Sequence, residues 1–249
     1  PISEEYRTLR TNLLFSSNGS VTKGVYIISS PGPSEGKSVT TANLAVTMAV
    51  AGWRVLLIDA DLRRPKLHDV FELDNSVGLS TLLAVDPGES FEGTGRASVQ
   101  QTLNECIRLT EIPNLSVITS GYIPLNPTEV LGSVAMQRWF QELQTSGQFD
   151  IVLFDTPPVL VVAKNTSVPP TLLSPNGADE PLPDLLVCVV DATNLQLGLR
   201  MVLETRAMGL PMVMALNMSD AARRAGIAID RALLSSELGM PVVETVGIH

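Results

Sequence analysis

The sequence predicts an α/β fold in which a doubly wound, mostly parallel β-sheet carries helices on both faces. Three observations lead to this prediction. Short apolar runs of strand length alternate with segments of helical periodicity along most of the chain. A glycine-containing loop joins the first apolar run to the next helix, and several later runs end at an acidic or amide side chain. Because connections of helix length favour parallel strands, we expect about seven strands in a single domain over residues 1–249.

Composition sets the first limits on function. The chain has 249 residues, of which 45% are hydrophobic, which is enough for a substantial core in one domain. Its net charge of −9 argues against nucleic acid as a partner, because such binding needs a basic face. No apolar run reaches the roughly 18 residues of a membrane-spanning helix, and the first residues lack the pattern of a signal peptide. Cys106 and Cys188 are far apart in sequence, so we expect a reduced, cytoplasmic location.

The first element is a helix predicted over residues 3–15. Tyr6, Leu9 and Leu13 recur at the spacing of one helical face. The opposite face carries three charged side chains, Glu4, Arg7 and Arg10. Periodicity alone assigns these charges to a solvated face.

The loop between the first strand and its helix is the strongest functional signal. Residues 25–28 are apolar, residues 39–51 are helical in pattern, and a Gly-Lys-Ser turn closes the loop between them. Such a turn points backbone N–H groups at an anion, while its lysine reaches the outer phosphates and its serine hydroxyl ligates Mg²⁺. Pro31 stands where the strict motif has glycine, and the alternative is a surface turn with one exposed lysine. The residues expected to contact a nucleotide are Gly32, Ser34, Glu35, Gly36, Lys37, Ser38 and Val39.

Acidic side chains follow two further strands. Asp59 and Asp61 come at the end of one apolar run, and Asp155 ends another. In parallel sheets the carboxyl ends of the strands form the ligand edge, beside the loop that holds Lys37. We expect Lys37, Asp59 and Asp61 to be catalytic, and Ser38, Asp59 and Asp155 to hold Mg²⁺ or its water. The alternative for Asp59 and Asp61 is a pair of solvated loop acids.

The middle of the chain is less regular. We expect a helix over residues 99–109, a strand over 115–119, and a second helix that starts at Asn126 with Pro127 and Glu129 in its first turn. One face of this second helix is assigned to the core, and it carries Leu131, Ala135, Trp139 and Leu143.

Residues 164–183 change character, because they are rich in proline and lack apolar periodicity. An α/β unit should place a helix here, so we interpret the stretch as a seam or a mobile loop. Regular alternation then resumes with strands over 185–191 and 212–217 and a helix over 194–208. The last elements are a helix capped by Asp230 that ends at Gly239 and a short strand that begins at Val242 and Val243.

The motifs of residues 4–163 together resemble the cytoplasmic domain of the bacterial tyrosine kinases (BY-kinases) that regulate capsule and exopolysaccharide synthesis. The matching stretches are EYRTLRTN at 5–12, GKS at 36–38, LIDADLRRP at 57–65, TSGYIPLNP at 119–127 and FDTPP at 154–158. The resemblance implies a Walker A role for Lys37 and Ser38 around Mg·ATP. It implies a Walker A′ role for Asp59 and Asp61 and a Walker B role for Asp155. It also implies that Pro31 is tolerated.

The same resemblance implies assembly and partners. Glu4, Arg7 and Arg10 match the family's ring-forming motif, which implies a homo-oligomer in which one subunit presents tyrosines to the next. The family's tyrosine cluster is missing, because the chain has three tyrosines, Tyr6, Tyr26 and Tyr122. We therefore expect that self-phosphorylation is impaired. The family's membrane adaptor is expected as a separate protein that would bring a cytoplasmic chain to a membrane.

Residues 184–249 resemble a different family, the back half of the G domain of the ferrous iron transporter FeoB. The matching stretches are DLLVCVVDATNL at 184–195, ALNMSD at 215–220 and GIAID at 226–230. In this resemblance Asn217 and Asp220 belong to the guanine-reading motif, whereas the family's phosphate loop, Asp-Leu-Pro-Gly switch and Ser-Ala motif are absent. We infer a chimera, natural or artificial, of two P-loop NTPase parts that meet near residues 164–183. The alternative is one divergent kinase whose tail has drifted.

The function expected from these residues is Mg²⁺-dependent binding of ATP by a P-loop NTPase that transfers or hydrolyses the terminal phosphate. The second candidate is a GTPase related to ferrous iron transport, because the Asp220 carboxylate can accept hydrogen bonds from N1–H and N2–H₂ of guanine. The third candidate is a non-catalytic nucleotide-binding scaffold. Phosphate release separates the first two candidates from the third, and base preference separates the first from the second.

Overall fold

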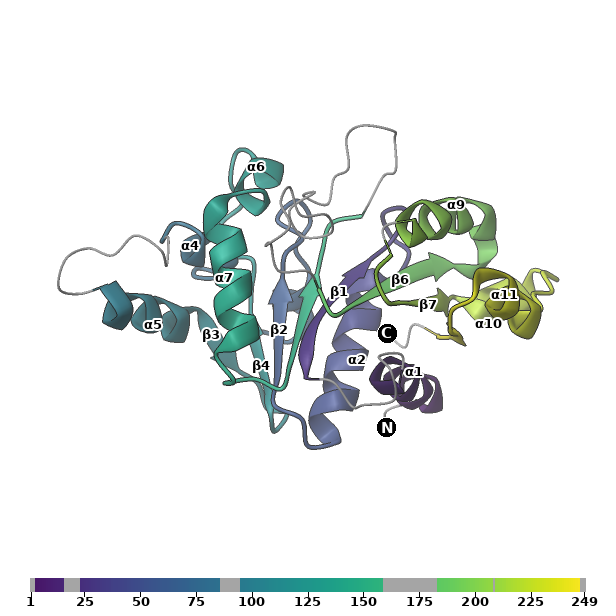
Figure 1. Cartoon of the computed structure of the whole chain (residues 1–249), viewed down its shortest axis with the longest axis horizontal. Coiled ribbons are helices and arrows are strands. Elements are labelled where there is room, and N and C mark those ends of the chain that lie inside the picture. Colours follow the sequence, from purple (N-terminus) through teal and green to yellow (C-terminus); the bar gives the residue numbers. More distant parts are fainter. Residues whose placement is uncertain (1–2, 16–22, 86–94, 159–182, 208, 247–249) are drawn as a thin grey trace.

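One mixed but mostly parallel sheet organises the chain (Figure 1). The computed structural model describes residues 3–15, 23–85, 95–158, 183–207 and 209–246, and within these ranges the sheet has eight strands. Their bounds are β1 Gly24–Ser29, β2 Val55–Asp59, β3 Ile107–Leu109, β4 Leu115–Ile118, β5 Ile151–Asp155, β6 Leu185–Asp191, β7 Met212–Asn217 and β8 Val242–Glu244. The strand order is β3-β4-β2-β5-β1-β6-β7-β8, and each neighbouring pair is parallel except β3 and β4. The doubly wound α/β fold is therefore confirmed.

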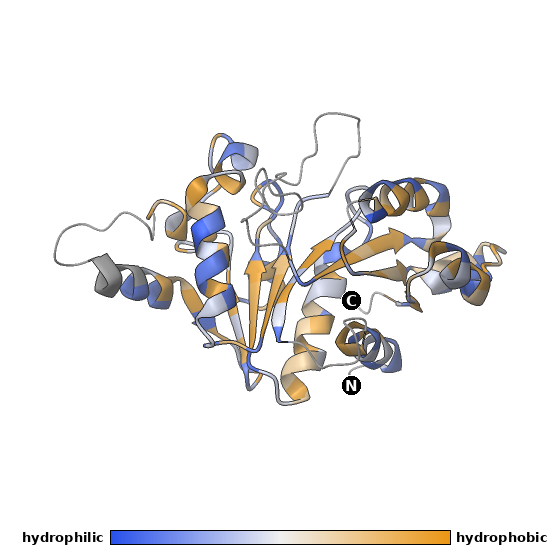
Figure 2. Cartoon of the chain, in the orientation of Figure 1, coloured by the Kyte–Doolittle hydropathy of each residue, from blue (hydrophilic) through white to orange (hydrophobic). Residues whose placement is uncertain are grey.

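Helices cover both faces of this sheet because consecutive side chains of a strand point to opposite sides. In β1, Tyr26 and Ile28 belong to the core beneath helices α1 (Glu4–Phe15) and α2 (Lys37–Val50). Val25 and Ile27 belong to the core beneath α7 (Val134–Thr145) and α9 (Leu195–Arg206). The central strands are consequently apolar along their length, as Figure 2 shows, which is typical of a parallel sheet buried on both sides.

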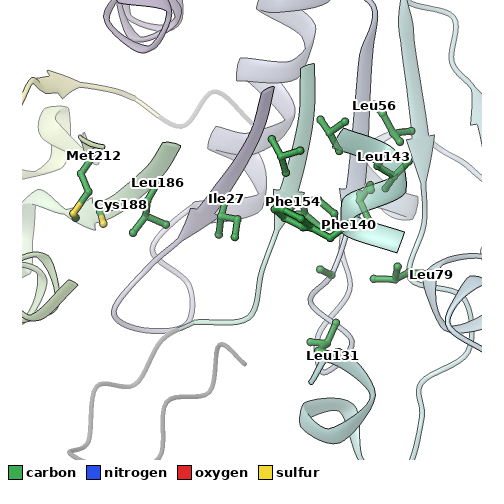
Figure 3. Close-up of a cluster of buried hydrophobic side chains, with 14 of the residues drawn as sticks. Ile27, Leu56, Leu79, Leu131, Phe140, Leu143, Phe154, Leu186, Cys188 and Met212 are labelled. Carbon is green, nitrogen blue, oxygen red and sulfur yellow. The ribbon is translucent and has the colours of Figure 1, made fainter. Parts of the chain in front are cut away.

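Aromatic side chains fasten α7 to its face of the sheet. The rings of Phe140 and Phe154 stack with their centroids 5.6 Å apart (Figure 3). The neighbouring Trp139 is buried, and its indole N–H donates to the carbonyl oxygens of Leu82 at 3.0 Å and Val85 at 2.8 Å. These carbonyls lie at and just beyond the end of the short helix α4 (Leu79–Leu82), so Trp139 joins α7 to α4 while Phe140 joins α7 to the sheet.

The helix predicted over residues 99–109 is wrong at its C-terminal end. Helix α5 spans Gly95–Cys106, and residues 107–109 form β3 instead. Ile107 pairs antiparallel with Ile118 of β4, which otherwise would be the edge strand of the sheet. The pairing with β4, the next strand along the chain, outweighs the helical pattern, and it adds the eighth strand to the seven that the sequence predicts.

The helix predicted from Asn126 is two helices in the structure. Helix α6 spans Pro127–Leu131, the chain breaks at Gly132, and α7 begins afresh behind Ser133. The Ser133 hydroxyl accepts the N–H of Met136 at 3.2 Å, which satisfies a donor in the first turn of α7. The expected core face is confirmed for Leu131, Trp139 and Leu143, whereas Ala135 is only partly buried and the core contains Met136 and Phe140 instead.

The C-terminal part continues the same sheet. Strand β6 pairs with β1, so the segments before and after the predicted seam belong to one sheet. The seam itself, over residues 164–182, lies outside the described residues. The expected strands over 185–191 and 212–217 are confirmed, with η1 (Ala192–Asn194) and α9 between them. Helices α10 (Ser219–Arg224) and α11 (Arg231–Leu238) follow β7. The Asp230 side chain accepts the N–H of Leu233 at 2.9 Å, which confirms the predicted cap.

The N-terminal helix packs beside the C-terminal strand. Tyr6 is fully buried, and its hydroxyl donates to the carbonyl oxygen of Val246 at 3.3 Å. Among the helices that the structure describes, none is both long and apolar enough to cross a membrane.

Candidate functional site

The loop after β1 and the start of α2 form one wall of a pocket at the carboxyl ends of β1, β2 and β5. Gly36 adopts a left-handed conformation with φ of 78°, and a Cβ at this position would collide with the Asn217 side chain. Glycine is therefore required here both by the backbone angle and by the close approach of β7. Helix α2 begins at the next residue, so its N-terminal N–H groups point toward the loop.

The pocket has a volume of about 470 Å³. It is lined by Ser30, Gly32, Pro33, Ser34, Gly36, Lys37, Ser38, Val39, Asp61, Arg63, Arg64, Lys66 and Pro158. Seven of the residues singled out in the sequence are thus brought together, namely Gly32, Ser34, Gly36, Lys37, Ser38, Val39 and Asp61. The other five, Glu35, Asp59, Asp155, Asn217 and Asp220, do not line it.

A buried charge cluster closes the floor of the pocket. The Lys37 ammonium lies 2.6 Å from Oδ1 of Asp155 and 3.7 Å from Oδ2 of Asp61. Thr41 of α2 donates to the same Asp155 oxygen at 3.2 Å, whereas Oδ2 of Asp155 is buried and has no hydrogen-bond partner among the described residues. A buried carboxylate oxygen with an unused lone pair is a ready acceptor for a metal ligand such as water.

Asp59 has a different environment from Asp61. Its Oδ2 accepts the backbone N–H groups of Lys66 at 3.0 Å and Leu67 at 2.9 Å, and its Oδ1 accepts that of Asp61 at 3.3 Å. Burial, together with the charge of Asp155, raises the pKa of Asp59 to about 7. Side chains two residues apart point to the same side only within a continuous strand, and β2 ends at Asp59. Asp59 and Asp61 therefore need not point in the same direction. Asp59 therefore holds the shape of the loop from which Asp61 reaches the pocket.

Glu35 lies beneath the phosphate loop. It is 7% exposed, its Oε2 has no hydrogen-bond partner among the residues that the structure describes, and a Cβ on Gly32 would approach its Oε1 to 3.0 Å. Burial and the charge of nearby Asp191 raise the pKa of Glu35 to about 8. The side chain is therefore mostly protonated near neutral pH, and it packs against Gly32 of the loop.

Asn217 braces the loop from β7. Its Nδ2 donates to the Glu35 carbonyl oxygen at 2.9 Å, and its Oδ1 accepts the Thr245 hydroxyl at 3.2 Å. Asp220 points elsewhere, because its carboxylate pairs with Arg224 at 2.7 Å one turn along α10. In this structure the Asn217 amide therefore contacts the phosphate loop, whereas the Asp220 carboxylate contacts Arg224 of its own helix.

Sequence reasoning missed four polar residues of this region, Thr41, Arg63, Arg64 and Lys66. Thr41 lies one turn after Lys37, so the helical period of α2 would place it on the same face. Arg63 and Arg64 lie within the stretch LIDADLRRP, but no pattern in the sequence indicates which pocket they border.

The three charged side chains singled out on α1 differ in their contacts. Glu4 and Arg7 are exposed and lie 3.5 Å apart, whereas the guanidinium of Arg10 donates to the Thr47 carbonyl oxygen of α2 at 3.1 Å. Arg10 therefore holds α1 against α2 within the chain.

Comparison with known families agrees with this geometry. Residues 27–169, more than half of the chain, match the family model described as AAA domain. The chain belongs to the AAA domain family. A second model, described as ferrous iron transport protein B, matches residues 145–249 of the same AAA domain chain. This match confirms the resemblance expected for the C-terminal part, and the two matches overlap over residues 145–169.

Individual relatives of this AAA domain chain include kinases. It is 43% identical over 163 residues to tyrosine-protein kinase YwqD of Bacillus subtilis (strain 168), a match that covers 65% of this chain and 61% of the relative. The chain therefore spans about three fifths of that kinase's length.

Solved structures share the fold of this AAA domain chain. The chimerical protein CapA2B2 superposes with a TM-score of 0.65 at 33% identity, covering 86% of this chain and 84% of that chain. The septum site-determining protein MinD from Pyrococcus horikoshii OT3 superposes with a TM-score of 0.63 at 20% identity, covering 88% and 79% of the two chains. The second likeness concerns the fold alone.

The raised pKa of Glu35 predicts a pH-dependent stability. An acid whose pKa is higher in the folded chain binds more protons when folded, so its contribution to stability falls as pH rises from about 4.5 to about 8. Glu35→Gln keeps a neutral group and should remove this fall. Relative to the parent, the Tm of Glu35→Gln should therefore rise between pH 5 and pH 8 by about 5 °C or more.

Thermal unfolding at a series of pH values checks this expectation. Asp59, whose pKa is also raised, is present in both proteins and cancels in the comparison. The exposed Glu237 of α11 supplies a control, since Glu237→Gln should leave the difference from the parent independent of pH. Parallel Tm curves for Glu35→Gln and the parent would contradict the assignment.

Proposed function

We propose that the chain binds Mg·ATP in this pocket and transfers the γ-phosphoryl group to a tyrosine hydroxyl of a protein. The observation that carries the proposal is the buried Lys37, which meets Asp155 and Asp61 at the N-terminus of α2. Lysine, helix N–H groups and acids at one sheet edge are the parts from which phosphoryl-transfer sites are built. The tyrosine as acceptor is supported by the name of the 43% identical relative, a tyrosine-protein kinase.

The residues of the pocket fit a Mg²⁺ ion. Within the described part of the chain Asp155 Oδ2 is buried without a hydrogen-bond partner, and Ser38 at the start of α2 lines the same pocket as Asp61. Among the described residues no three His, Cys, Asp or Glu side chains gather as a metal site, so phosphate oxygens and water would complete the ligand set. Ser38 and Asp155 would hold the ion or its water, and the bound ion would neutralise charge on the phosphates.

Each protein group at the site has its own role in the proposed phosphoryl transfer. Lys37 stabilises charge on the outer phosphates, and the loop N–H groups orient them. The Asp61 carboxylate lines the pocket and is placed to accept the phenolic proton, whereas Asp59 is occupied by three backbone N–H groups. In the reaction the bond between the γ-phosphorus and the β–γ bridging oxygen breaks and a bond to the tyrosine oxygen forms. ADP leaves with the electron pair of the broken bond.

Burial limits which tyrosines of this sequence could accept the phosphoryl group. The chain has three tyrosines, of which Tyr6 and Tyr26 are fully buried, while Tyr122 is 56% exposed. The two buried hydroxyls cannot reach a phosphate without unfolding, which supports the expected impairment of self-phosphorylation.

Lys37→Met tests the site. Removal of the ammonium should lower phosphoryl transfer or ATP hydrolysis by about a hundredfold or more, because the outer phosphates lose their charge partner. The measurement is phosphate release and peptide phosphorylation with Mg·ATP, alongside a circular dichroism spectrum, since Asp155 and Asp61 lose their partner.

The control for this experiment is Lys23→Met. Lys23 is exposed and pairs with Asp150 at 2.8 Å. It lies just before β1, at the opposite end of that strand from the pocket, so its loss should leave turnover unchanged. A folded Lys37→Met protein with the parent's turnover would discard the proposed site.

A GTPase is the second candidate, and the match of residues 145–249 to ferrous iron transport protein B favours it. The contact between Asp220 and Arg224 weighs against it, because guanine would have to displace that ion pair. We expect Asp220→Ala to leave the ratio of ATP to GTP dissociation constants within about twofold of the parent. Titration with both nucleotides and Mg²⁺ measures the ratio, and a shift of about tenfold or more toward ATP would instead show that Asp220 reads the base.

Self-association through α1 is part of the proposal. Arg7 is exposed, whereas Arg10 also supports α2, so Arg7 is the cleaner position for a test. Arg7→Ala should weaken an oligomer of the parent by about fivefold or more in dissociation constant, because it removes a charged group from the exposed face. Sedimentation equilibrium measures this constant, with Arg200→Ala on α9 as the control, and a parent that stays monomeric at every concentration would contradict the proposal.

A further inference from the structure

A rim of positive charge borders the mouth of the pocket. We define the cationic rim as Arg63, Arg64 and Lys66, which follow β2 and are all exposed. The chain as a whole has a net charge of −9, so this gathering of like charges runs against its composition. Lys66 pairs with Asp69 at 3.4 Å, but no carboxylate among the described residues forms an ion pair with Arg63 or Arg64.

The rim has a fixed position relative to the reacting groups. The backbone N–H groups of Arg63 and Arg64 donate to Asp61 Oδ1 at 3.3 and 3.1 Å, while Oδ2 of the same carboxylate faces Lys37. The Arg63 guanidinium donates to the Thr128 hydroxyl at 2.6 Å, which turns it toward α6. The side chain that is placed to accept the phenolic proton therefore also anchors the two arginines.

A second hollow continues from the rim. Its volume is about 510 Å³, and it is lined by Arg63, Leu125, Asn126, Pro127, Thr128 and Glu129. Arg63 lines both hollows, so one surface leads from the phosphate pocket to α6. Leu125 is fully exposed, and the single acid of the hollow, Glu129, accepts a hydrogen bond from Asn126 at 3.0 Å. The surface thus offers positive charge next to the pocket and an apolar side chain farther out.

This combination fits a peptide better than it fits a polyanion. A nucleic acid or an anionic membrane would meet a chain of net charge −9 and only a local cationic rim. An acceptor segment that lies across the pocket would bring the residues flanking its tyrosine to Arg63 and Arg64. Acidic residues at those flanks would be complementary to these two guanidinium groups, which have no carboxylate partner among the described residues.

We propose that Arg63 and Arg64 bind carboxylates of the acceptor protein, so that the enzyme prefers a tyrosine flanked by acidic residues, with an apolar residue of the acceptor against Leu125. This inference rests on the proposed tyrosine phosphorylation. The arginines act as specificity residues, because they contact the acceptor and not the transferred phosphate.

The test uses two synthetic peptides that differ only in the residues flanking one tyrosine, glutamates in one and glutamines in the other. With the full chain and Mg·ATP, the glutamate peptide should have the higher kcat/KM by about fivefold, the size expected for two exposed charge pairs. The preference should shrink at high salt, because exposed charges are screened. In Arg63→Gln with Arg64→Gln the ratio should fall close to one.

Matched variants separate this effect from a loss of charge or of fold. Arg200→Gln with Arg224→Gln removes the same charge from α9 and α10 and should keep the parent's ratio. Arg64→Gln alone leaves the bond between Arg63 and Thr128 intact and should lose about half of the preference on a logarithmic scale. Equal kcat/KM values for the two peptides in the parent, or a preference that survives in the double variant at the rim, would overturn the inference.

A binding measurement distinguishes failure of the inference from failure of the proposed function. If neither peptide is phosphorylated while ATP is hydrolysed, tyrosine phosphorylation is wrong for this chain. Fluorescence anisotropy with dye-labelled versions of both peptides then reads the rim directly in the presence of Mg·ADP. Tighter binding of the glutamate peptide that is lost in Arg63→Gln with Arg64→Gln would support the rim as an acidic-peptide site, and equal binding would overturn it.

Discussion

The contact between Lys37 and the two carboxylates of Asp155 and Asp61 is the interaction on which the site depends. Four ionisable groups, including Asp59, are almost completely buried at one edge of the sheet, and burying charge costs free energy unless each group has partners. The structure supplies them through the ammonium of Lys37, the hydroxyl of Thr41 and the N–H groups of the loop after β2. One Asp155 oxygen has no partner in the part of the chain that the structure describes, and this is where a metal-bound water would complete the network.

This network requires that β2, β5 and β1 lie side by side in parallel, because only then do their carboxyl ends meet. The part of the chain that matches ferrous iron transport protein B extends the same sheet through β6, β7 and β8. It also reaches the phosphate loop, since Asn217 of β7 holds the Glu35 carbonyl and Thr245 holds Asn217. Two segments that match different family models therefore share one core and one loop, and the union of two P-loop NTPase parts stays a prediction from the sequence.

In our proposal the segment after β2 joins phosphate chemistry to acceptor recognition. Asp59 shapes it through the N–H groups of Lys66 and Leu67, and Asp61 extends from it toward Lys37. Arg63 extends in the other direction to Thr128. A single loop can therefore position both the carboxylate that would take the proton and the arginines that would bind the substrate protein. A substitution at either place is expected to shift the position of the other.

The sequence by itself determined the features that depend on neighbouring residues. Apolar runs located seven strands, the Gly-Lys-Ser turn located the pocket, and Asp230 was recognisable as a cap, because periodicity and capping act within a few residues. Residues 107–109 escaped it, since their pairing with β4 is a contact that no local pattern records. Only the tertiary structure decided that Asp59 shapes a loop while Asp61 faces the pocket, that Asn217 braces the phosphate loop, and that Arg63 meets Thr128. Each of these depends on strand order and on side-chain direction in a packed interior, where residues far apart in the chain become neighbours.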